Sequence, residues 1–168
     1  MSLNRDLIPS ALREIFGHFP SGVAALCSTV GGAPQGIVAS TFTVGVSLDP
    51  PLVMFAAQNS SRTWPLLRDR ERIGVSVLAA DQADICRQIA AKTGDRFAGA
   101  RLTTTASGAA FLEDAVLWLD CSVETQTPAG DHTVVLLRVH GYCTRENRGD
   151  PLIFHASDFR SLQVHSFA

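Results

Sequence analysis

The sequence contains none of the short motifs that mark the common nucleotide-binding and catalytic sites. No G-x-G-x-x-G occurs, which argues against a Rossmann dinucleotide site. Three glycine pairs have the spacing of a phosphate-binding P-loop, but each is followed by Val, Ile or Ala where lysine is required. An H-E-x-x-H zinc motif and a G-x-S-x-G nucleophile elbow are also absent, and the five histidines are scattered singly. What remains suits chemistry carried out by a bound organic cofactor that the protein positions.

Charged residues are scarce: they make up 18% of the 168 residues and leave a net charge of −2. The chain therefore has no basic field that would hold nucleic acid. Of the 14 basic residues only Lys92 is a lysine, a bias that we attribute to genomic composition. One or two arginines at most are candidates for gripping a phosphate. Hydrophobic residues, at 46%, exceed what the surface of a small monomer easily hides, so the composition predicts a dimer or larger assembly.

Cysteine pairs and long apolar runs are missing as well. The four cysteines, at positions 27, 86, 121 and 143, form no C-x-x-C pair, and Cys27, Cys121 and Cys143 stand within apolar strand-like runs. They are predicted to be reduced core residues, and neither a disulfide framework nor a zinc site. The N-terminus has no apolar signal segment, and no run approaches the ~20 residues that a membrane-spanning helix needs. We therefore expect a soluble, cytoplasmic protein with no membrane partner.

The periodicity of the apolar residues predicts few helices and many strands. Helical spacing covers residues 7–18, 61–70 and 81–92, the last with Asp81 as N-cap. Strand-like runs cover residues 23–30, 52–57, 73–78, 115–127, 133–144 and 152–154, and Gly31-Gly32 is the turn of a hairpin whose second arm begins near Gln35. Because the strands follow one another in hairpins, we expect a mainly β fold: a small closed or split antiparallel barrel with a few flanking helices. The length predicts one domain over residues 1–168.

The most informative segment, residues 36–51, reads as a strand, a loop lined with hydroxyl groups and a double proline. Small residues let the chain approach a ligand closely, main-chain N–H groups and short hydroxyls bind polar atoms, and prolines hold a loop in shape. This combination suits a ligand that carries a flat ring and a phosphate. The plainer alternative is that Ser40 and Thr41 face solvent on an ordinary strand and that Asp49 and the two prolines form only a rigid turn.

Three other segments carry candidate residues with plain alternatives. Residues 60–63 contain a good helix N-cap in Ser61, and the free N–H groups of a helix start are also suited to binding an anion. Arg96 is a candidate for contact with a ligand, and the plain alternative is that it is only a charged residue on the surface. His132 follows Gly130 and Asp131 between two long apolar strands, where a hairpin tip alone would explain the glycine and the aspartate.

Eight short motifs, taken in their order along the chain, resemble the short-chain flavin reductase family. They are residues 19–23, 36–42, 47–53, 61–63, 73–78, 95–99, 119–121 and 130–132. Each motif alone is weak, but eight in order are specific, and the resemblance covers the chain from about residue 12 to 162. One departure follows Gly108, where residues 109–112 read Ala-Ala-Phe-Leu and relatives usually carry a proline.

The resemblance implies a split β-barrel of the FMN-binding type that works as a homodimer. It also implies that FMN or FAD is reduced by NADH or NADPH, and that the reduced flavin is often released to a partner monooxygenase. Hydride transfer is then a task of positioning, since the nicotinamide C4 must lie within about 3–3.5 Å of the flavin N5. A nicotinamide that stacks on the flavin needs no dinucleotide fold of its own.

Carried over by position, the resemblance also implies roles for individual residues. Those beside the flavin ring are Val38, Ala39, Ser40, Thr41 and Phe42, and those beside the ribityl chain are Ser47 and Asp49. Those that hold the flavin phosphate are Ser60, Ser61, Arg62 and Thr63, while Arg96 and Phe97 close over the cofactor. His132 is assigned to the nicotinamide side, where an imidazole can donate a hydrogen bond or supply a proton.

Two alternatives stay open for a chain of this resemblance. The same fold can hold a tightly bound FMN that acts on another substrate, and retention of yellow colour through desalting would identify that case. A non-catalytic flavin-binding protein is the second alternative, and it predicts no consumption of NADH with either added flavin.

Overall fold

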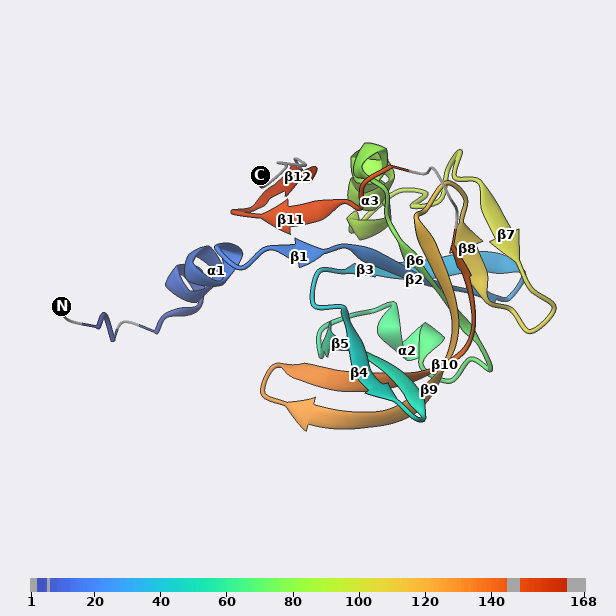
Figure 1. Ribbon diagram of the computed structural model, residues 1–168, viewed down its shortest axis with the longest axis horizontal. Helices are drawn as coiled ribbons and strands as arrows, with labels where there is room; N and C mark the ends of the chain where they lie inside the picture. The colour runs from blue at the N-terminus through green and yellow to red at the C-terminus, as the bar shows by residue number, and fades with distance from the viewer. Residues whose placement is uncertain (1–2, 6, 145–148, 163–168) are drawn as a thin grey trace, which may run out of the picture.

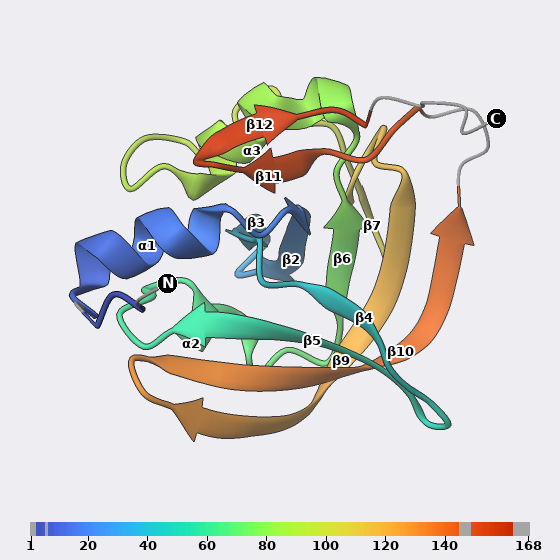
Figure 2. The same ribbon diagram turned by 60° about the vertical axis from the view of Figure 1, so that its left-hand side comes forward.

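The computed structural model describes residues 3–5, 7–144 and 149–162, and β-strands dominate it (Figures 1 and 2). The helices are α1 (Pro9–Gly17), α2 (Trp64–Leu67), the 3-10 helix η1 (Ala80–Gln82) and α3 (Ala83–Ala90). The strands are β1 (Ser21–Gly22), β2 (Ala24–Val30), β3 (Ala33–Ala39), β4 (Thr43–Leu48), β5 (Pro51–Gln58), β6 (Ile73–Val77), β7 (Leu102–Thr104), β8 (Ala110–Leu112), β9 (Leu117–Ala129), β10 (His132–Thr144), β11 (Ile153–His155) and β12 (Asp158–Arg160). The expectation of a mainly β fold with a few helices is confirmed.

Seven strands form one antiparallel sheet in the order β3-β2-β6-β9-β10-β5-β4. The predicted turn at Gly31-Gly32 joins β2 to β3, with Val30 paired to Ala33. The sheet curls until β3 contacts β5 (Figure 1). Its two outermost strands, β3 and β4, are consecutive in sequence, so the barrel is split between them. The predicted split antiparallel barrel is confirmed.

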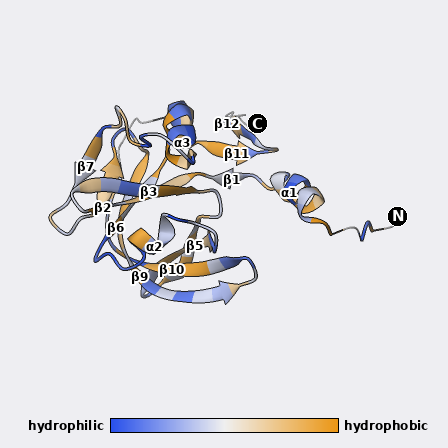
Figure 3. Ribbon diagram, turned by 180° about the vertical axis from the view of Figure 1, so that it is seen from behind, coloured by the Kyte–Doolittle hydropathy of each residue, from blue (hydrophilic) through white to orange (hydrophobic). Residues whose placement is uncertain are grey.

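The barrel interior is filled by alternate residues of its strands. Along β5 the side chains of Val53, Phe55 and Ala57 are buried, while their neighbours are partly exposed, as expected for a strand with one face on the core. Trp64 of α2 packs against Phe55 with the ring centroids 5.1 Å apart, which places this short helix against the same core. Figure 3 shows the hydrophobic strands around this interior and the more polar end of β9 beyond it.

Strand β2 is buried on both faces, which explains its continuous apolar run. Ala24 and Leu26 face the barrel interior, whereas Ala25 and Cys27 face a second core. The second core also includes Ile89 of α3, so α3 covers the outside of β2. Burial raises the pKa of the Cys27 thiol to about 12, and that of Cys86 to about 11, so both behave as inert core residues.

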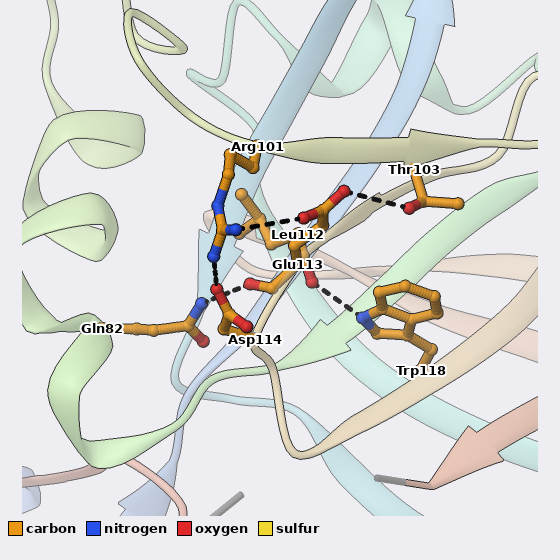
Figure 4. A network of polar contacts seen from close by, with 7 residues as sticks. All are labelled: Gln82, Arg101, Thr103, Leu112, Glu113, Asp114 and Trp118. Carbon is orange, nitrogen blue, oxygen red and sulfur yellow. Dashed lines mark hydrogen bonds and ion pairs between the residues drawn. The ribbon is translucent and has the colours of Figure 1, made fainter.

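Residues 109–112, which depart from the pattern of the resembled family, are buried in the fold. Ala110–Leu112 forms β8. A Cβ at Gly74 would lie 2.2 Å from the Ala110 carbonyl oxygen, so only glycine lets β6 approach β8 this closely. Figure 4 shows the polar network beside β8, in which Arg101 pairs with Asp114 and Trp118 Nε1 donates to the Leu112 carbonyl oxygen at 2.8 Å. This region therefore holds the β7–β8 hairpin against the barrel.

Two predicted helices are shorter than expected. The helix predicted over residues 61–70 is only the single turn α2, because Trp64 and Leu67 are its only buried residues and no apolar stripe supports a longer helix. The helix predicted over residues 81–92 divides into η1 and α3. The prediction that Asp81 caps it is wrong: Gln82 takes the N-cap position of α3, and its Oε1 accepts a hydrogen bond from the Ala79 main-chain N–H at 3.0 Å.

Two other features differ from expectation or extend it. Cys143 is exposed, so its assignment to the core is wrong. It lies near the end of β10, where it pairs with Trp118 of β9 but has passed the last residue paired with β5. Helix α1 falls within the predicted residues 7–18 but buries none of its residues, and Phe16 is 67% exposed. Within the described ranges, no helix combines the length and the apolar character required to cross a bilayer.

Candidate functional site

An open cavity of about 920 Å³ lies beside the split in the barrel. One side, which we call the strand side, consists of residues 35 and 37–39 of β3, residues 40–41 that follow it, and residues 56–58 of β5. The other, the loop side, consists of residues 60–63 and Lys92. His132, Arg96, Leu66 and residues 89–91 complete the lining. The volume falls near the upper end of the ~300–1,000 Å³ that is typical of small-molecule sites.

The cavity gathers most of the residues that the sequence singled out, from segments far apart in the chain. Those that line it are Val38, Ala39, Ser40, Thr41, Ser60, Ser61, Arg62, Thr63, Arg96 and His132. Those that do not line it are Phe42, Ser47, Asp49 and Phe97. The barrel brings the first group together because β3, at one edge of the curled sheet, contacts β5 near the other edge, and β10 pairs with β5.

Ser40 and Thr41 are both exposed but differ in what their hydroxyls do. Thr41 Oγ1 accepts a hydrogen bond from the Ala56 main-chain N–H at 3.0 Å and donates to the Ala56 carbonyl oxygen at 3.3 Å. This side chain thus satisfies β5 at the point where β4 no longer pairs with it. Ser40 makes no hydrogen bond with any described residue, so its hydroxyl is available to a ligand.

The loop side presents two cationic side chains. Arg62 Nη2 donates to the Lys92 carbonyl oxygen at 3.2 Å, which brings the two residues together across the cavity lining. The Lys92 ammonium has no partner among the described residues. No carboxylate is among the lining residues. Two cations without an acid favour an anionic group such as a phosphate.

Ser61 and Thr63 begin the single turn of α2. Ser61 Oγ accepts a hydrogen bond from the Trp64 main-chain N–H at 3.1 Å, so the predicted capping by Ser61 is seen even though Thr63 is the residue before the helix. Thr63 is buried, whereas Ser60 is exposed. A one-turn helix adds little dipole, so the case for an anion on the loop side rests on Arg62 and Lys92.

Arg96 is fastened to the strand side. Its Nη1 donates to the carbonyl oxygens of Gly36 at 3.1 Å and Ile89 at 3.5 Å, and its Nη2 donates to Gln35 Oε1 at 3.3 Å. Phe97 packs into the second core, where a Cβ on Gly36 would lie 2.9 Å from the Phe97 ring. Arg96 and Phe97 therefore anchor the loop after α3 against β3.

His132 is the first residue of β10 and follows a two-residue turn in which Gly130 has a φ of +63°. Its Nδ1 lies 2.7 Å from Asp131 Oδ1. The hydrogen bond and charge of His132 hold the pKa of Asp131 below its usual value. The His132 ring is 32% exposed, and its Nε2 forms no hydrogen bond within the described part of the chain.

Ser47 and Asp49 lie toward the opposite end of the β4–β5 hairpin. Ser47 pairs with Leu52, and Leu52 is four positions along β5 from Ala56, the nearest cavity residue of that strand, a span of about 13 Å at the usual rise per strand residue. Phe42 packs against the barrel core. The ligand contacts expected of these residues and of Phe97 stay predictions.

The sequence reasoning missed Lys92, Gln35 and residues 56–58 as lining residues. Lys92 is the only lysine, which is a signal in the sequence, although genomic composition also explains the scarcity of lysine. Gln58 pairs with His132 in the β5–β10 ladder, so the strand register identifies it once the pairing is known. Such a register joins residues 74 positions apart and cannot be derived from one segment alone.

The lining fits a flat-ring ligand with a phosphate. Ala39, Ala56 and Ala57 are small and leave room for a ring, the Ser40 hydroxyl is free, and Arg62 and Lys92 supply positive charge. A flavin nucleotide has both the flat ring and the phosphate that this lining would accommodate.

Comparisons with known proteins point the same way. Residues 16–163 match the model of the flavin reductase-like domain. The chain is 35% identical over 152 residues to the actinorhodin polyketide dimerase of Streptomyces coelicolor, covering 90% of this chain and 85% of that protein. It is 31% identical over 156 residues to the reductase subunit HsaB of a flavin-dependent monooxygenase of Rhodococcus jostii, covering 92% and 78%. The structure of the NADH:FAD oxidoreductase SgcE6 of Streptomyces globisporus, in complex with NAD and FAD fragments, superposes with a TM-score of 0.90 at 29% identity and covers 99% of both chains.

Proposed function

The chain belongs to the family of flavin reductase-like domains, and on that premise we propose that it is an NAD(P)H-dependent flavin reductase. It transfers a hydride from NADH or NADPH to FMN or FAD and supplies the reduced flavin to a partner monooxygenase. The observation that carries this proposal is the single cavity shared by the free Ser40 hydroxyl, the cations Arg62 and Lys92, and His132. The relatives that are a monooxygenase reductase subunit and an NADH:FAD oxidoreductase support it.

A bound flavin supplies the hydride-accepting chemistry, and the protein supplies position and charge. Arg62 and Lys92, with Ser60, Ser61 and Thr63, bind its phosphate. Val38, Ala39, Ser40 and Thr41 flank its ring. His132 orients the nicotinamide by a hydrogen bond from the imidazole, and holding the two rings in reacting geometry accounts for the rate enhancement.

His132→Ala tests the proposal at the nicotinamide end. We expect NADH oxidation to fall while the flavin dissociation constant stays nearly unchanged, because His132 lies apart from the cationic loop side. His140→Ala is the matched control, since His140 is exposed, bonds to Ser122 at 2.8 Å and does not line the cavity. Unchanged turnover in His132→Ala would remove His132 from the mechanism.

An assay that crosses both flavins with both nicotinamides identifies the preferred pair. No NADH consumption with either flavin would favour a non-catalytic flavin-binding protein.

We also propose that the protein is a homodimer that acts in the cytoplasm. Support for the dimer comes from α1, whose Ile15 and Phe16 are exposed, and from the outer strand β4, whose Val44 and Val46 are exposed. A second copy would cover this apolar surface. Light scattering after size exclusion should give twice the monomer mass for the wild type and a smaller mass for Phe16→Asp. A wild-type monomer at micromolar concentration contradicts the proposal.

The second candidate is a protein of the same fold that keeps its flavin and acts on another substrate. The relative whose name is a polyketide dimerase favours it. Desalting separates the two cases: a released flavin fits the reductase, whereas protein that stays yellow at a stoichiometric level fits the second candidate.

A further inference from the structure

Asn59 makes more hydrogen bonds to the turn before β10 than any cavity residue does. Its main-chain N–H donates to the Asp131 carbonyl oxygen at 3.0 Å. Its Nδ2 donates to the Gly130 carbonyl oxygen at 3.2 Å, and its Oδ1 accepts from Thr133 Oγ1 at 2.9 Å. The three bonds reach residues on both sides of His132, and none of them involves the His132 imidazole.

We propose that Asn59 is the positioning residue for His132, an inference that rests on the proposed role of His132 toward the nicotinamide. The β9–β10 ladder pairs His132 with Ala129 and the β5–β10 ladder pairs it with Gln58, but neither ladder includes the two-residue tip, Gly130 and Asp131. Asn59 fastens this tip to the end of β5, next to Gln58, the residue that pairs with His132. The imidazole is thereby held at the cavity.

The residue type matters because the bonds require a donor and an acceptor on one short side chain. An amide supplies both, whereas a carboxylate lacks the donor and a hydroxyl is too short to reach both partners. Asp131 contacts His132 directly, but Asp131 Oδ1 is on an exposed side chain that moves with the same turn. Asn59 lies outside the turn and can therefore fix its position.

Asn59 also joins the two ends of the cavity. The Ser61 main-chain N–H donates to the Gln58 carbonyl oxygen at 2.9 Å, so Asn59 is part of a tight turn that leads into the loop side. One turn thus sets both the residues that face the phosphate and the hairpin that carries His132.

Asn59→Ala should lower kcat/KM for NADH about 10-fold, because small misplacements of reacting groups have large effects on rate. The flavin dissociation constant should change less than twofold. In the His132→Ala background the same substitution should have no further effect, since Asn59 acts through His132. Equal losses in the two backgrounds would overturn the proposal.

Nuclear magnetic resonance of the ligand-free protein gives a readout independent of turnover. In Asn59→Ala the His132 ring should show greater mobility, while Thr133→Val should reproduce part of the effect. The control is Gln82→Ala, which removes a side-chain amide with two comparable bonds, to Ala79 and to Glu113, at a residue that does not line the cavity. Figure 4 shows its contact with Glu113. This control variant should leave the His132 resonances unchanged. An unchanged His132 ring in Asn59→Ala refutes the inference, whereas wild-type turnover in His132→Ala alone would refute the role proposed for His132 and leave the resonance result standing.

Discussion

The strand side and the loop side of the cavity leave different polar groups free. Among the described residues, the strand side leaves the Ser40 hydroxyl free, and the loop side leaves the Lys92 ammonium free. On the strand side Thr41 is bonded to Ala56, and Arg96 is bonded to the carbonyl oxygens of Gly36 and Ile89. On the loop side the Lys92 ammonium has no partner in the described ranges, and Arg62 uses one donor on the Lys92 carbonyl oxygen. Residue type alone does not separate the two sides, because each carries a hydroxyl and a guanidinium.

The difference follows from what surrounds each side. The end of β5 has main-chain groups that no neighbouring strand satisfies, and nearby side chains bond to them. The loop side lies outside the sheet. Ser61 Oγ accepts from the Trp64 main-chain N–H there, but no main-chain group engages the Lys92 ammonium within the described ranges. Substitution of a bonded side chain such as Thr41 is therefore expected to change the free energy of unfolding, and substitution of a free one such as Ser40 or Lys92 the affinity for a ligand.

The largest effect is expected on the strand side, for Gly36→Ala. The new Cβ would lie 2.5 Å from Cys27 Sγ and 2.9 Å from the Phe97 ring, inside a packed core. Overpacking of this kind lowers the free energy of unfolding by about 1–3 kcal/mol. Urea unfolding measures the loss, and Gly22→Ala is the control because its Cβ would meet nothing within 4 Å. Equal stability of the two variants would contradict the tight packing of Phe97 on β3.

On the loop side, Lys92→Ala should weaken flavin binding about 10-fold, which corresponds to about 1.4 kcal/mol. The reason is the loss of a charge-assisted contact with the phosphate, and the effect should diminish with added salt. Flavin fluorescence titration measures affinity, and Lys92→Arg should retain most of it. Unfolding in urea should be unchanged, because the ammonium contacts no other described residue.

Amine labelling tests the same assignment without a substitution. Lys92 is the only lysine, so an amine-reactive reagent can modify only this side chain and the N-terminus. Bound flavin should protect Lys92 and leave the N-terminus reactive. Equal labelling with and without saturating flavin would place the phosphate elsewhere.

The contrast also shows how far the sequence alone could lead. Alternation of apolar and polar residues located the strands, and the short turns at Gly31-Gly32 and Gly130-Asp131 are the turns of the β2–β3 and β9–β10 hairpins. Local patterns contain this information, because each strand carries its own period. The strands β1, β7, β8 and β12 were missed, since runs of two or three residues seldom show a period. Strand β4 was also missed, because Thr43–Leu48 falls within the segment read as a loop.

Side-chain partners were the part that sequence could not supply. Thr41 and Ser40 are neighbours with similar hydroxyls, and only the fold shows that Ala56 occupies one of them. Arg96 resembles a ligand residue until β3 brings the Gly36 carbonyl oxygen within reach. Both contacts depend on pairing between distant segments, so a single sequence leaves them undetermined.

Thr41→Val should lower the free energy of unfolding by about 1 kcal/mol, the usual contribution of a hydrogen bond whose loss leaves a main-chain group unsatisfied. Ser40→Ala is the matched comparison, and its stability should stay at the wild-type value. The order should reverse for ligand binding: Ser40→Ala weakens flavin affinity a few-fold if its free hydroxyl meets the flavin, and Thr41→Val changes it less. A lower free energy of unfolding in Ser40→Ala would contradict the view that the Ser40 hydroxyl is free while that of Thr41 is bonded.

The smallest effect is expected at Asp131, which precedes His132 and is exposed. Its pKa is lowered by the hydrogen bond and charge of His132, so in His132→Ala it should rise back toward the usual value for an aspartate. A carboxyl with a lowered pKa stabilises the folded protein above its unfolded-state pKa, and this contribution is lost as the pH falls through the folded-state pKa. Because the side chain is 93% exposed, solvent screens the pair and stability at acidic pH should differ little between wild type and variant. Carbon-13 resonance titration of the Asp131 carboxyl measures the shift, and identical titrations in both proteins would show that Asp131 and His132 are not paired in solution.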